Sequence, residues 1–230
     1  MARHSRILTR LEPARRRPGP FLADGLPPLS QALKRGFDVA LSALIIVAFV
    51  PLLALVGAAL STQGWPIVIR HRRVGCGGRT FPCLKFRTMV VDAEAVLNRH
   101  LSENPAARAE WEATHKLKDD PRVTALGRVL RKSSLDELPQ LINVLRGEMS
   151  LVGPRPIVPA EVRHYGADIA IYQSVRPGLT GAWQISGRSD VSYERRVALD
   201  RTYVSEQSFR RDLAILALTI PAVLKSKGSY

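Results

Sequence analysis

Cysteine is scarce in this sequence. Its 230 residues include only Cys76 and Cys83, which lie in one short stretch. A single pair cannot complete a structural zinc site, and it cannot build the disulfide framework of a small secreted protein. We therefore expect a reducing, cytosol-facing location, with both cysteines acting as small buried or half-buried side chains.

Acidic and aromatic side chains are also few. The chain has 20 Asp and Glu residues against 34 Lys and Arg residues, which gives a formal net charge of +14. This excess predicts an anionic partner: nucleic acid, anionic lipid or a phosphate-rich substrate. Aromatic residues, on which bases stack in many nucleic-acid-binding proteins, make up only 6% of the chain. The composition therefore favours lipid or phosphate over nucleic acid.

Common catalytic and targeting motifs are missing. The sequence has no P-loop, no GxGxxG or GxSxG motif and no cluster of Cys and His. These absences exclude a standard nucleotide cradle, the nucleophile elbow of α/β hydrolases and a Cys/His metal site. The first apolar run begins near Val39, too far along the chain for the hydrophobic region of a cleavable signal peptide.

One long apolar run is present, at residues 39–60, and it carries no charged side chain. Its length matches the roughly 20 residues that cross a hydrocarbon core. Basic residues flank it on both sides, at 34–35 and 70–73, whereas a spanning helix is usually basic on its cytoplasmic side only. Pro51 removes a backbone hydrogen bond within the run. The pattern favours a re-entrant helix that breaks at Pro51 and returns to the same face; a straight span with a proline kink is the alternative.

The apolar run divides the chain into three parts. Residues 1–33 are rich in Arg and Pro, which predicts a disordered basic arm, either bound to anionic lipid headgroups or solvated. Residues 34–63 form the re-entrant membrane helix, and residues 64–230 form a cytosolic domain. The predicted fold class is α+β and mostly α: a helix-break-helix membrane element, then a small domain with a short β-hairpin and interfacial amphipathic helices.

The cytosolic part alternates β-prone and helix-prone segments. The predicted elements are a hairpin of residues 66–70 and 80–86, and helices at 91–114, 123–132, 138–146 and 209–224. Asn104-Pro105 interrupts the first of these helices, and Pro221 interrupts the last. Basic ends suit the last helix to the membrane interface; packing on the soluble core is the alternative.

The adjacent carboxylates of Asp136 and Glu137 are the main candidates for chemistry. Neighbouring residues near a helix start diverge by about 100°, so one carboxylate can face a substrate while the other binds a metal. The helix N-terminus and nearby basic residues such as Arg131 should keep Asp136 ionised and nucleophilic. The alternative is structural, because Ser134-x-x-Glu137 is also a capping-box pattern that only ties off a helix.

Arginines in stiff loops are candidates for phosphate binding. Arg87, Arg155 and Arg188 lie in segments rich in glycine and proline. A guanidinium binds phosphate oxygens bidentately, and a rigid loop lowers the entropy cost of holding it in place. For any one of them, a solvated surface charge is the alternative.

Taken together, these segments resemble the bacterial sugar transferase family, the monotopic polyprenyl-phosphate phosphoglycosyl transferases, in their minimal exopolysaccharide-priming form. The matching motifs run in family order at residues 34–38, 85–89, 120–124, 130–141, 149–156, 176–181, 187–188 and 200–203. One departure is Val50, where family members often have serine before the breaking proline. The ordered set is specific, and only the N-terminal arm lies outside it.

The resemblance implies a ping-pong reaction. Asp136 attacks the β-phosphorus of a UDP-sugar, UMP leaves, and the phosphosugar passes from Asp136 to undecaprenyl phosphate. Glu137 is the implied ligand of Mg²⁺. Arg131, Arg155 and Arg188 match family arginines near the phosphates and nucleotide, with Lys85 and Asp200 in supporting positions.

The resemblance also implies a place in the cell. The protein would lie in the bacterial plasma membrane, with residues 64–230 as a catalytic domain on the cytoplasmic face. Its partners would be the two substrates and anionic membrane lipids, without nucleic acid, and a homodimer is compatible with this arrangement. Two other functions stay open: transfer by direct displacement without a covalent intermediate, and a membrane-tethered basic protein that binds lipid or nucleic acid. The sequence does not identify the sugar.

Overall fold

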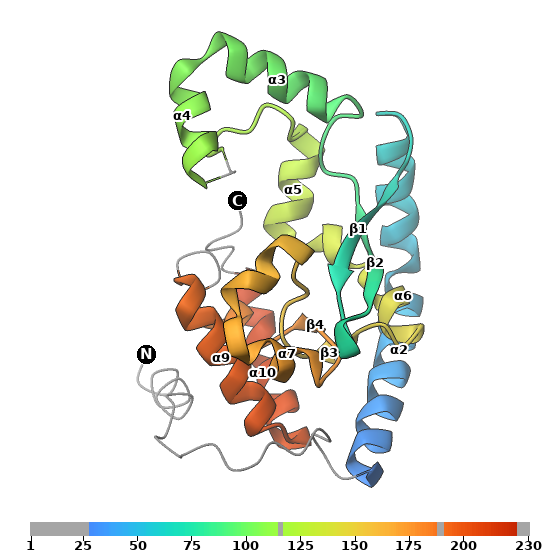
Figure 1. The fold of residues 1–230 in the computed structure, drawn as a ribbon. Helices are drawn as coiled ribbons and strands as arrows, with labels where there is room; N and C mark the ends of the chain where they lie inside the picture. Colours follow the sequence, from blue (N-terminus) through green and yellow to red (C-terminus); the bar gives the residue numbers. More distant parts are fainter. Residues whose placement is uncertain (1–27, 115–116, 188–190, 225–230) are drawn as a thin grey trace.

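The computed structural model describes residues 28–114, 117–187 and 191–224, and this part of the chain is mostly helical with two small two-stranded sheets (Figure 1). In chain order the elements are α2 (Pro28–Ser61), β1 (Val68–Val74), η1 (Cys76–Gly78), β2 (Thr80–Phe86), α3 (Ala93–Glu103), α4 (Pro105–Thr114), α5 (Ala125–Ser133), η2 (Leu135–Glu137), α6 (Gln140–Leu145), β3 (Ser150–Val152), η3 (Pro159–His164), η4 (Gly166–Asp168), α7 (Ile169–Gln173), β4 (Gly178–Thr180), α8 (Ala182–Ile185), α9 (Tyr193–Ser205) and α10 (Phe209–Leu224). The η elements are 3-10 helices. The predicted fold class is confirmed in its mostly helical character and its small hairpin.

Helix α2 contains the apolar run. Its 34 residues correspond to about 51 Å of helix, and Figure 1 shows it along one side of the molecule. Among the described residues it is the one helix long and apolar enough to cross a membrane. Large apolar side chains in its middle are exposed, namely Leu44, Val47, Val50 and Leu55. A continuous apolar surface of this kind indicates contact with lipid or with another apolar surface.

The limits of α2 differ from the predicted ones. The helix begins at Pro28, where a missing N–H costs nothing because the first turn has no carbonyl to pair with it. Residues 28–33 are therefore helical and do not belong to the predicted basic arm, whose residues 1–27 lie outside the described residues. Pro51 lies inside one helix that the structure does not divide, so the structure does not show the predicted break, and the re-entrant topology stays a prediction.

Both ends of α2 pack against the rest of the molecule. Near its start, the Lys34 ammonium donates to Asp212 of α10 at 2.6 Å, and the Arg35 guanidinium donates to the Val144 carbonyl of α6 at 2.6 Å. Near its end, Leu60 is fully buried in a cluster with Phe86 of β2. One body therefore holds the long apolar helix at its two ends.

The predicted hairpin is confirmed. Strands β1 and β2 pair antiparallel, with Ile69 opposite Lys85 and His71 opposite Cys83. Strand β1 continues to Val74, beyond the predicted end at residue 70, because the residues up to Val74 still find partners on β2.

Helices α3 and α4 form a lobe at one end of the molecule (Figure 1). The predicted interruption at Asn104-Pro105 is confirmed, since α3 ends at Glu103 and α4 begins at Pro105. The lobe has a small core of its own around Leu97, Ala107 and Leu117. It joins the rest of the protein through a short antiparallel contact between Met89 and Val123.

The main core lies where β3, α9 and α10 meet, with Leu151, Tyr203 and Ile215 among its fully buried side chains. Helix α10 packs on this core through one face, and it leaves Leu213 and Ile220 exposed. The prediction that Pro221 interrupts this helix is wrong, because α10 runs on to Leu224 and gives up only the hydrogen bond that proline cannot donate.

Candidate active site

The two adjacent acids lie on the turn η2, between α5 and α6. Ser134, which begins this turn, has a left-handed backbone with φ of 59° and makes no capping hydrogen bond through its side chain. A capping box needs its first residue in an extended conformation, with the serine oxygen over the next turn. The capping-box alternative is therefore wrong, and the carboxylates of Asp136 and Glu137 have other partners.

Both carboxylates face Lys85 of β2. The Lys85 Nζ atom lies 2.7 Å from Glu137 Oε1 and 3.6 Å from Asp136 Oδ2. Asp136 is buried, with 7% of its surface exposed, whereas Glu137 is half-buried. One ammonium group therefore reaches both carboxylates.

Arg155 approaches the same group from the loop after β3. Its Nη1 atom lies 3.4 Å from Glu137 Oε1, and its Cζ atom lies 5.4 Å from the centre of the Trp183 ring, within cation–π range. Arg196 of α9 donates to the Arg155 carbonyl at 3.2 Å and also stacks on Trp183, at 5.0 Å. These contacts fix the loop that presents the Arg155 guanidinium.

Arg131 lies in the last turn of α5, and its charge acts on Asp136. Its Nε atom donates to the hydroxyl of Thr88 at 2.9 Å, and Thr88 is itself buried. Helix α5 can approach this segment because of Gly127: a Cβ atom there would lie 1.9 Å from the Thr88 carbonyl oxygen. The buried Thr88 hydroxyl thus positions Arg131, which matches a family arginine near the phosphates.

The two acids have opposite pKa shifts. Burial alone would raise the pKa of Glu137, but the charges of Lys85 and Arg155 outweigh it and lower this pKa to about 2. Burial raises the pKa of Asp136, and the charge of Glu137 adds to the rise, while Lys85 and Arg131 oppose it. Lys85 and Arg131 thus favour the ionised form of Asp136 as expected, but desolvation outweighs them and the net shift of its pKa is upward.

One of the arginines predicted to bind phosphate, Arg87, does not join this group. Arg87 is 5% exposed, and its guanidinium donates to the carbonyls of Leu60, Gln63, Gly64 and Pro66 at 2.8–3.3 Å. It therefore binds the C-terminal end of α2, where carbonyls have no helical partner, and its predicted phosphate role is wrong. Arg188 lies outside the described residues.

Asp200, predicted to be a supporting residue, lies on α9. Its side chain is fully buried on α9 and accepts a hydrogen bond of 2.7 Å from the Tyr165 hydroxyl. Burial raises the pKa of Asp200 to about 6, although the charge of Arg196 and the Tyr165 hydrogen bond act against the rise. The charge of Asp200 acts on Arg196, which donates to the Arg155 carbonyl, and the supporting role of Asp200 stays a prediction.

A small pocket lies beside Glu137. Its lining includes the predicted residues Lys85 and Arg155, and also Arg73, Cys83 and Gln140, which were not predicted as site residues. Burial raises the pKa of the Cys83 thiol to about 11, which excludes Cys83 as a thiolate nucleophile at neutral pH. The alternation of side chains along β1 could have indicated Arg73, because residues opposite one another in an antiparallel pair share a face.

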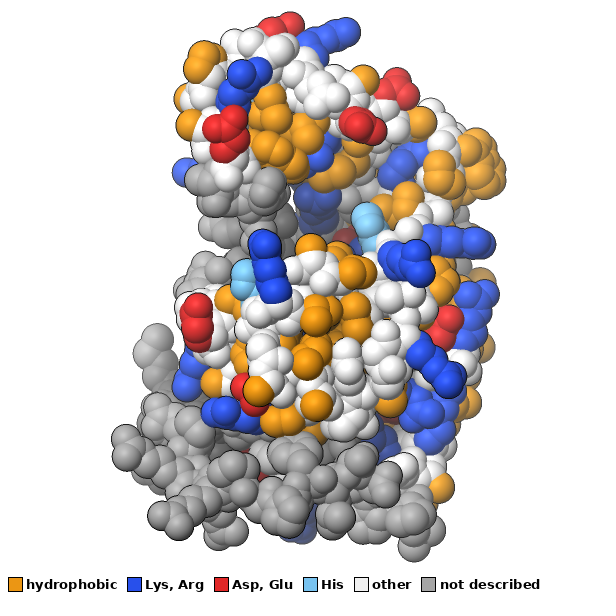
Figure 2. Space-filling model, in the orientation of Figure 1, with side chains coloured by type: hydrophobic (Ala, Val, Ile, Leu, Met, Phe, Trp, Pro, Cys, Tyr) orange, Lys and Arg blue, Asp and Glu red, His pale blue; other side chains and the backbone are white. Residues whose placement is uncertain are grey.

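The surroundings of the pocket are strongly cationic. Burial lowers the pKa of His71, and the charges of Arg73, Lys85 and Arg131 lower it further. In the view of Figure 2 the surface is hollowed between the α3–α4 lobe and the part of the molecule below it, with Lys and Arg side chains along this hollow. The site therefore suits a polyanionic ligand.

The carboxylates also fit a magnesium ion that arrives with such a ligand. Proteins usually hold Mg²⁺ through one or two carboxylates together with substrate phosphates, and Asp136 and Glu137 provide two. Within the described ranges no group of three or more Asp, Glu, His and Cys side chains could hold a metal ion on its own. The residues thus match a metal shared with phosphate and do not form an all-protein metal cage.

This arrangement can perform nucleophilic chemistry on a phosphate ester. A buried carboxylate, Asp136, lies among cations that can neutralise charge on phosphate oxygens. Glu137, Lys85 and Arg155 form an ion-paired group that keeps those cations in place.

Comparison with known proteins finds relatives over most of the chain. The profile of the family described as bacterial sugar transferase matches residues 29–226. The exopolysaccharide production protein ExoY of Sinorhizobium fredii is 53% identical over 204 residues, which are 88% of this chain and 90% of that protein. The undecaprenyl-phosphate galactose phosphotransferase of Salmonella typhimurium is 49% identical over 201 residues, 87% of this chain.

These relatives differ in length. The chain spans only 42% of the Salmonella protein. A third relative, the UDP-glucose:undecaprenyl-phosphate glucose-1-phosphate transferase of Caulobacter vibrioides, is 40% identical over 206 residues, which are 86% of this chain and 72% of that protein. The matched region contains every described residue of the candidate site.

Proposed function

The chain belongs to the bacterial sugar transferase family, and from this premise we propose that it transfers a sugar 1-phosphate from a UDP-sugar to undecaprenyl phosphate and releases UMP. The names of the Salmonella and Caulobacter relatives support the two substrates, and the name of the ExoY relative supports a role in exopolysaccharide production. The reaction would be the first membrane step of polysaccharide synthesis.

The observation that carries this proposal is the buried Asp136 carboxylate with Lys85 at 3.6 Å and Arg131 and Arg155 around it. In the first step, an oxygen of ionised Asp136 attacks the β-phosphorus of the UDP-sugar. A bond from this oxygen to phosphorus forms, and the bond from the β-phosphorus to the bridging oxygen breaks. UMP leaves with that oxygen and the electron pair, so that a phosphosugar remains on Asp136.

In the second step, a phosphate oxygen of undecaprenyl phosphate attacks the same phosphorus. The bond between phosphorus and Asp136 breaks, and the free carboxylate is restored. Lys85, Arg131 and Arg155 neutralise the charge that develops on the phosphate oxygens in both steps. Because these cations are held by Glu137, Thr88 and the Trp183 ring, they need little reorganisation during the reaction.

Glu137 would hold the magnesium ion, with Asp136 beside it. When bound, the ion would screen the charge of the diphosphate. EDTA should then abolish activity, and Glu137→Gln should be severely impaired even at high Mg²⁺ concentration. Full activity in EDTA would remove the metal from the proposal.

The proposed membrane placement follows from α2. One body binds this helix at both ends, through Lys34 and Arg35 at one and Leu60 at the other. Both ends would then lie on the cytoplasmic face of the plasma membrane, as in the predicted re-entrant helix with a break at Pro51. The exposed apolar middle of α2 would contact lipid, close to where a polyprenyl chain would enter.

The test of the proposed function is UMP release by the purified protein with undecaprenyl phosphate. A panel of UDP-linked galactose, glucose and their N-acetylated forms covers the sugars that the site could accept. We expect release with at least one of them, and only in the presence of the protein. No release with any member of the panel, with Mg²⁺ present, would overturn the proposed substrates.

A further inference from the structure

Arg73 of β1 is an arginine that the two steps above do not use. It lines the pocket beside Glu137 together with Lys85 and Arg155, and it is half-buried. No described residue accepts a hydrogen bond from its guanidinium or forms an ion pair with it. The other buried arginine near the pocket, Arg196, has Glu161 at 3.5 Å. The Glu161 carboxylate acts on Arg73 through its charge but forms no ion pair with it. Among the described residues this half-buried guanidinium thus has lost part of its hydration without gaining a direct partner, which favours binding of an anion there.

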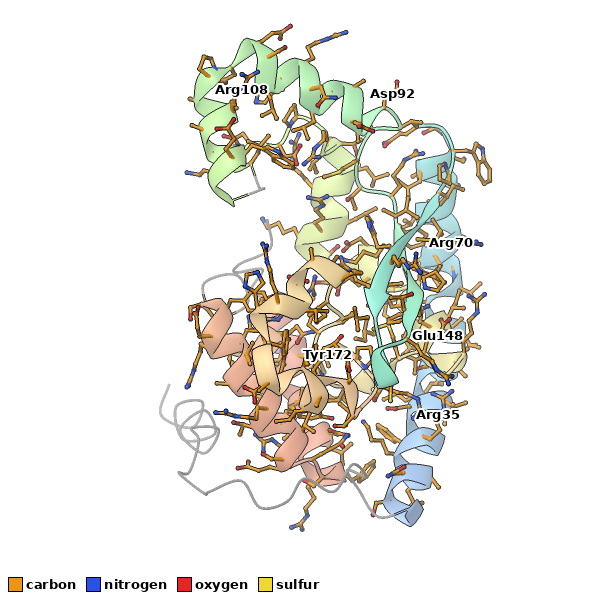
Figure 3. The ribbon with its side chains drawn as sticks, in the orientation of Figure 1. Arg35, Arg70, Asp92, Arg108, Glu148 and Tyr172 are labelled. Atoms are coloured by element: carbon orange, nitrogen blue, oxygen red, sulfur yellow. The ribbon has the colours of Figure 1, made fainter. Side chains whose placement is uncertain are left out.

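The hairpin fixes the direction of this side chain. Arg73 lies opposite Phe81, and Ile69 lies opposite Lys85, in the register of β1 and β2. Residues two apart on a strand project from the same face, so Arg73 and Lys85 share the face that looks onto Glu137. Arg70 is on the other face, and Figure 3 shows its side chain pointing outward from the molecule.

Arg73 and Arg155 lie close enough to repel each other. Burial lowers the pKa of Arg73, and the charge of Arg155 is the next largest cause of that lowering. Arg155 reaches Glu137 with one nitrogen, Nη1, at 3.4 Å. The other nitrogens of its guanidinium group remain available to bind a ligand. Two guanidinium groups at one pocket match the doubly charged oxygens of a phosphate monoester, which each can bind bidentately.

The order in which bonds form and break at the β-phosphorus predicts a phosphate monoester in this pocket in each step. Asp136 enters from one side of the β-phosphorus, and an in-line displacement expels UMP from the opposite side. The acceptor must then displace Asp136 in line, so its phosphate approaches from the side that UMP has left. The leaving phosphate and the entering phosphate therefore occupy the same position in turn.

We propose that Arg73 and Arg155 form this single phosphate monoester subsite, which holds the phosphate of departing UMP and then the phosphate of the polyprenyl acceptor. The inference rests on the proposed function and assigns to Arg73 a substrate-binding role. It makes UMP a competitor of the acceptor for one site. It also predicts that one substitution weakens the binding of both by the same factor.

The experiment compares wild type with Arg73→Gln, using full-length protein and undecaprenyl phosphate as the varied substrate at several UMP concentrations. We expect competitive inhibition by UMP in wild type. In Arg73→Gln, the KM for undecaprenyl phosphate and the inhibition constant of UMP should rise together, each by about tenfold or more, as for the loss of a charge-assisted hydrogen bond. Arg73→Lys, which keeps the charge and loses the bidentate fork, should lie between the two.

Arg70→Gln is the matched control, because it removes the same charge from the same strand on the opposite face and should keep wild-type constants. The thermal stability of Arg73→Gln should stay close to that of wild type, since the substitution removes no hydrogen bond or ion pair with the described residues. A rise in only one of the two constants, or in neither, overturns the shared subsite.

A direct titration of UMP separates this inference from the proposed function. If wild type releases no UMP from any UDP-sugar, the proposed function fails. Binding of UMP, measured by calorimetry without any turnover, still tests Arg73. Equal affinity of wild type and Arg73→Gln for UMP would overturn the subsite, and an affinity about tenfold or more weaker in the variant would support it.

Discussion

The Lys85 ammonium lies between two neighbouring carboxylates, 2.7 Å from Glu137 Oε1 and 3.6 Å from Asp136 Oδ2. One side chain of the hairpin thus binds both acids of the η2 turn. Glu137, which makes the shorter contact, has its pKa lowered to about 2. Asp136, which makes the longer contact, has its pKa raised by burial. Glu137 therefore carries the shorter ion pair with Lys85, and the Asp136 carboxylate is the one proposed to attack phosphorus.

The first prediction concerns Lys85→Gln. Removal of the ammonium should lower kcat/KM by about a hundredfold or more, because a fixed cation at the reacting phosphate is lost. It should also move the acidic limb of the pH profile to higher pH, since Lys85 acts to lower the pKa of Asp136. The pH dependence of kcat/KM for UMP release measures both effects.

The control is Lys118→Gln, which removes an exposed lysine that forms no ion pair with the acids of η2. It should leave both the rate and the pH profile as in wild type. An unchanged acidic limb in Lys85→Gln would contradict the electrostatic link between Lys85 and Asp136.

The second prediction concerns Thr88, which positions Arg131 through a hydrogen bond of 2.9 Å. Thr88→Val keeps the volume of the side chain and removes the acceptor, so kcat should fall by about tenfold. Thr88→Ser keeps the hydroxyl and should restore most of the rate. Steady-state kinetics of the three proteins, with their thermal stabilities, would show whether the loss is kinetic; a Thr88→Val variant with wild-type kcat would contradict the role.

The third prediction uses the pKa of Asp200, which burial raises from 3.8 to about 6. A carboxyl group with a raised pKa in the folded state favours folding while it is protonated, and this contribution is lost as the pH rises from about 4 through 6. Asp200→Asn stays neutral and keeps an oxygen for the Tyr165 hydroxyl. Relative to wild type it should gain stability over this range, by up to about 3 kcal/mol.

Thermal unfolding of both proteins at pH 4 and pH 7.5 measures the difference. Other titrating groups affect both proteins equally and cancel. If the stabilities of wild type and Asp200→Asn changed with pH by the same amount, a raised pKa for Asp200 would be contradicted.

Local patterns predicted much of the fold and part of the site. The hairpin follows from β-prone runs around a glycine-rich turn, and the break before Pro105 follows from the lost N–H of proline. Asp136 and Glu137 were identifiable because two adjacent acids stand out in a basic segment. Contacts between residues far apart in the sequence could not be predicted from such local patterns.

Two arginines illustrate the difference. Arg87 and Arg155 occupy similar stiff loops in the sequence, yet Arg87 binds carbonyls at the end of α2 and Arg155 reaches Glu137. Arg73 was missed because its direction depends on which strand pairs with β1. The raised pKa of Asp136 likewise results from burial by segments distant in the sequence, which no local pattern contains.

The fourth prediction concerns the topology of α2. Leu33 and Trp65 flank the apolar run and are 64% and 69% exposed, so a cysteine at either position should be reachable by a reagent. In a Cys76→Ser background, which removes the exposed native thiol, both should react with a membrane-impermeant maleimide only after the cells are opened. Labelling of either position in intact spheroplasts would contradict placement of both ends on the cytoplasmic face.

The central claim is that Asp136 forms a covalent bond to the phosphosugar, and its direct test is to trap this species. The wild-type protein is incubated with a UDP-sugar labelled in its β-phosphate, without undecaprenyl phosphate, and the label on the protein is counted after denaturation. Asp136→Asn is the matched variant, because the amide has nearly the same shape and forms no acyl phosphate. We expect label on wild type that undecaprenyl phosphate removes, none on Asp136→Asn, and release of UMP lower in the variant by orders of magnitude at equal thermal stability. Absence of label on an active wild type, or a stable Asp136→Asn that keeps about a tenth or more of the activity, which is a barrier change below about 1.4 kcal/mol, would contradict the account.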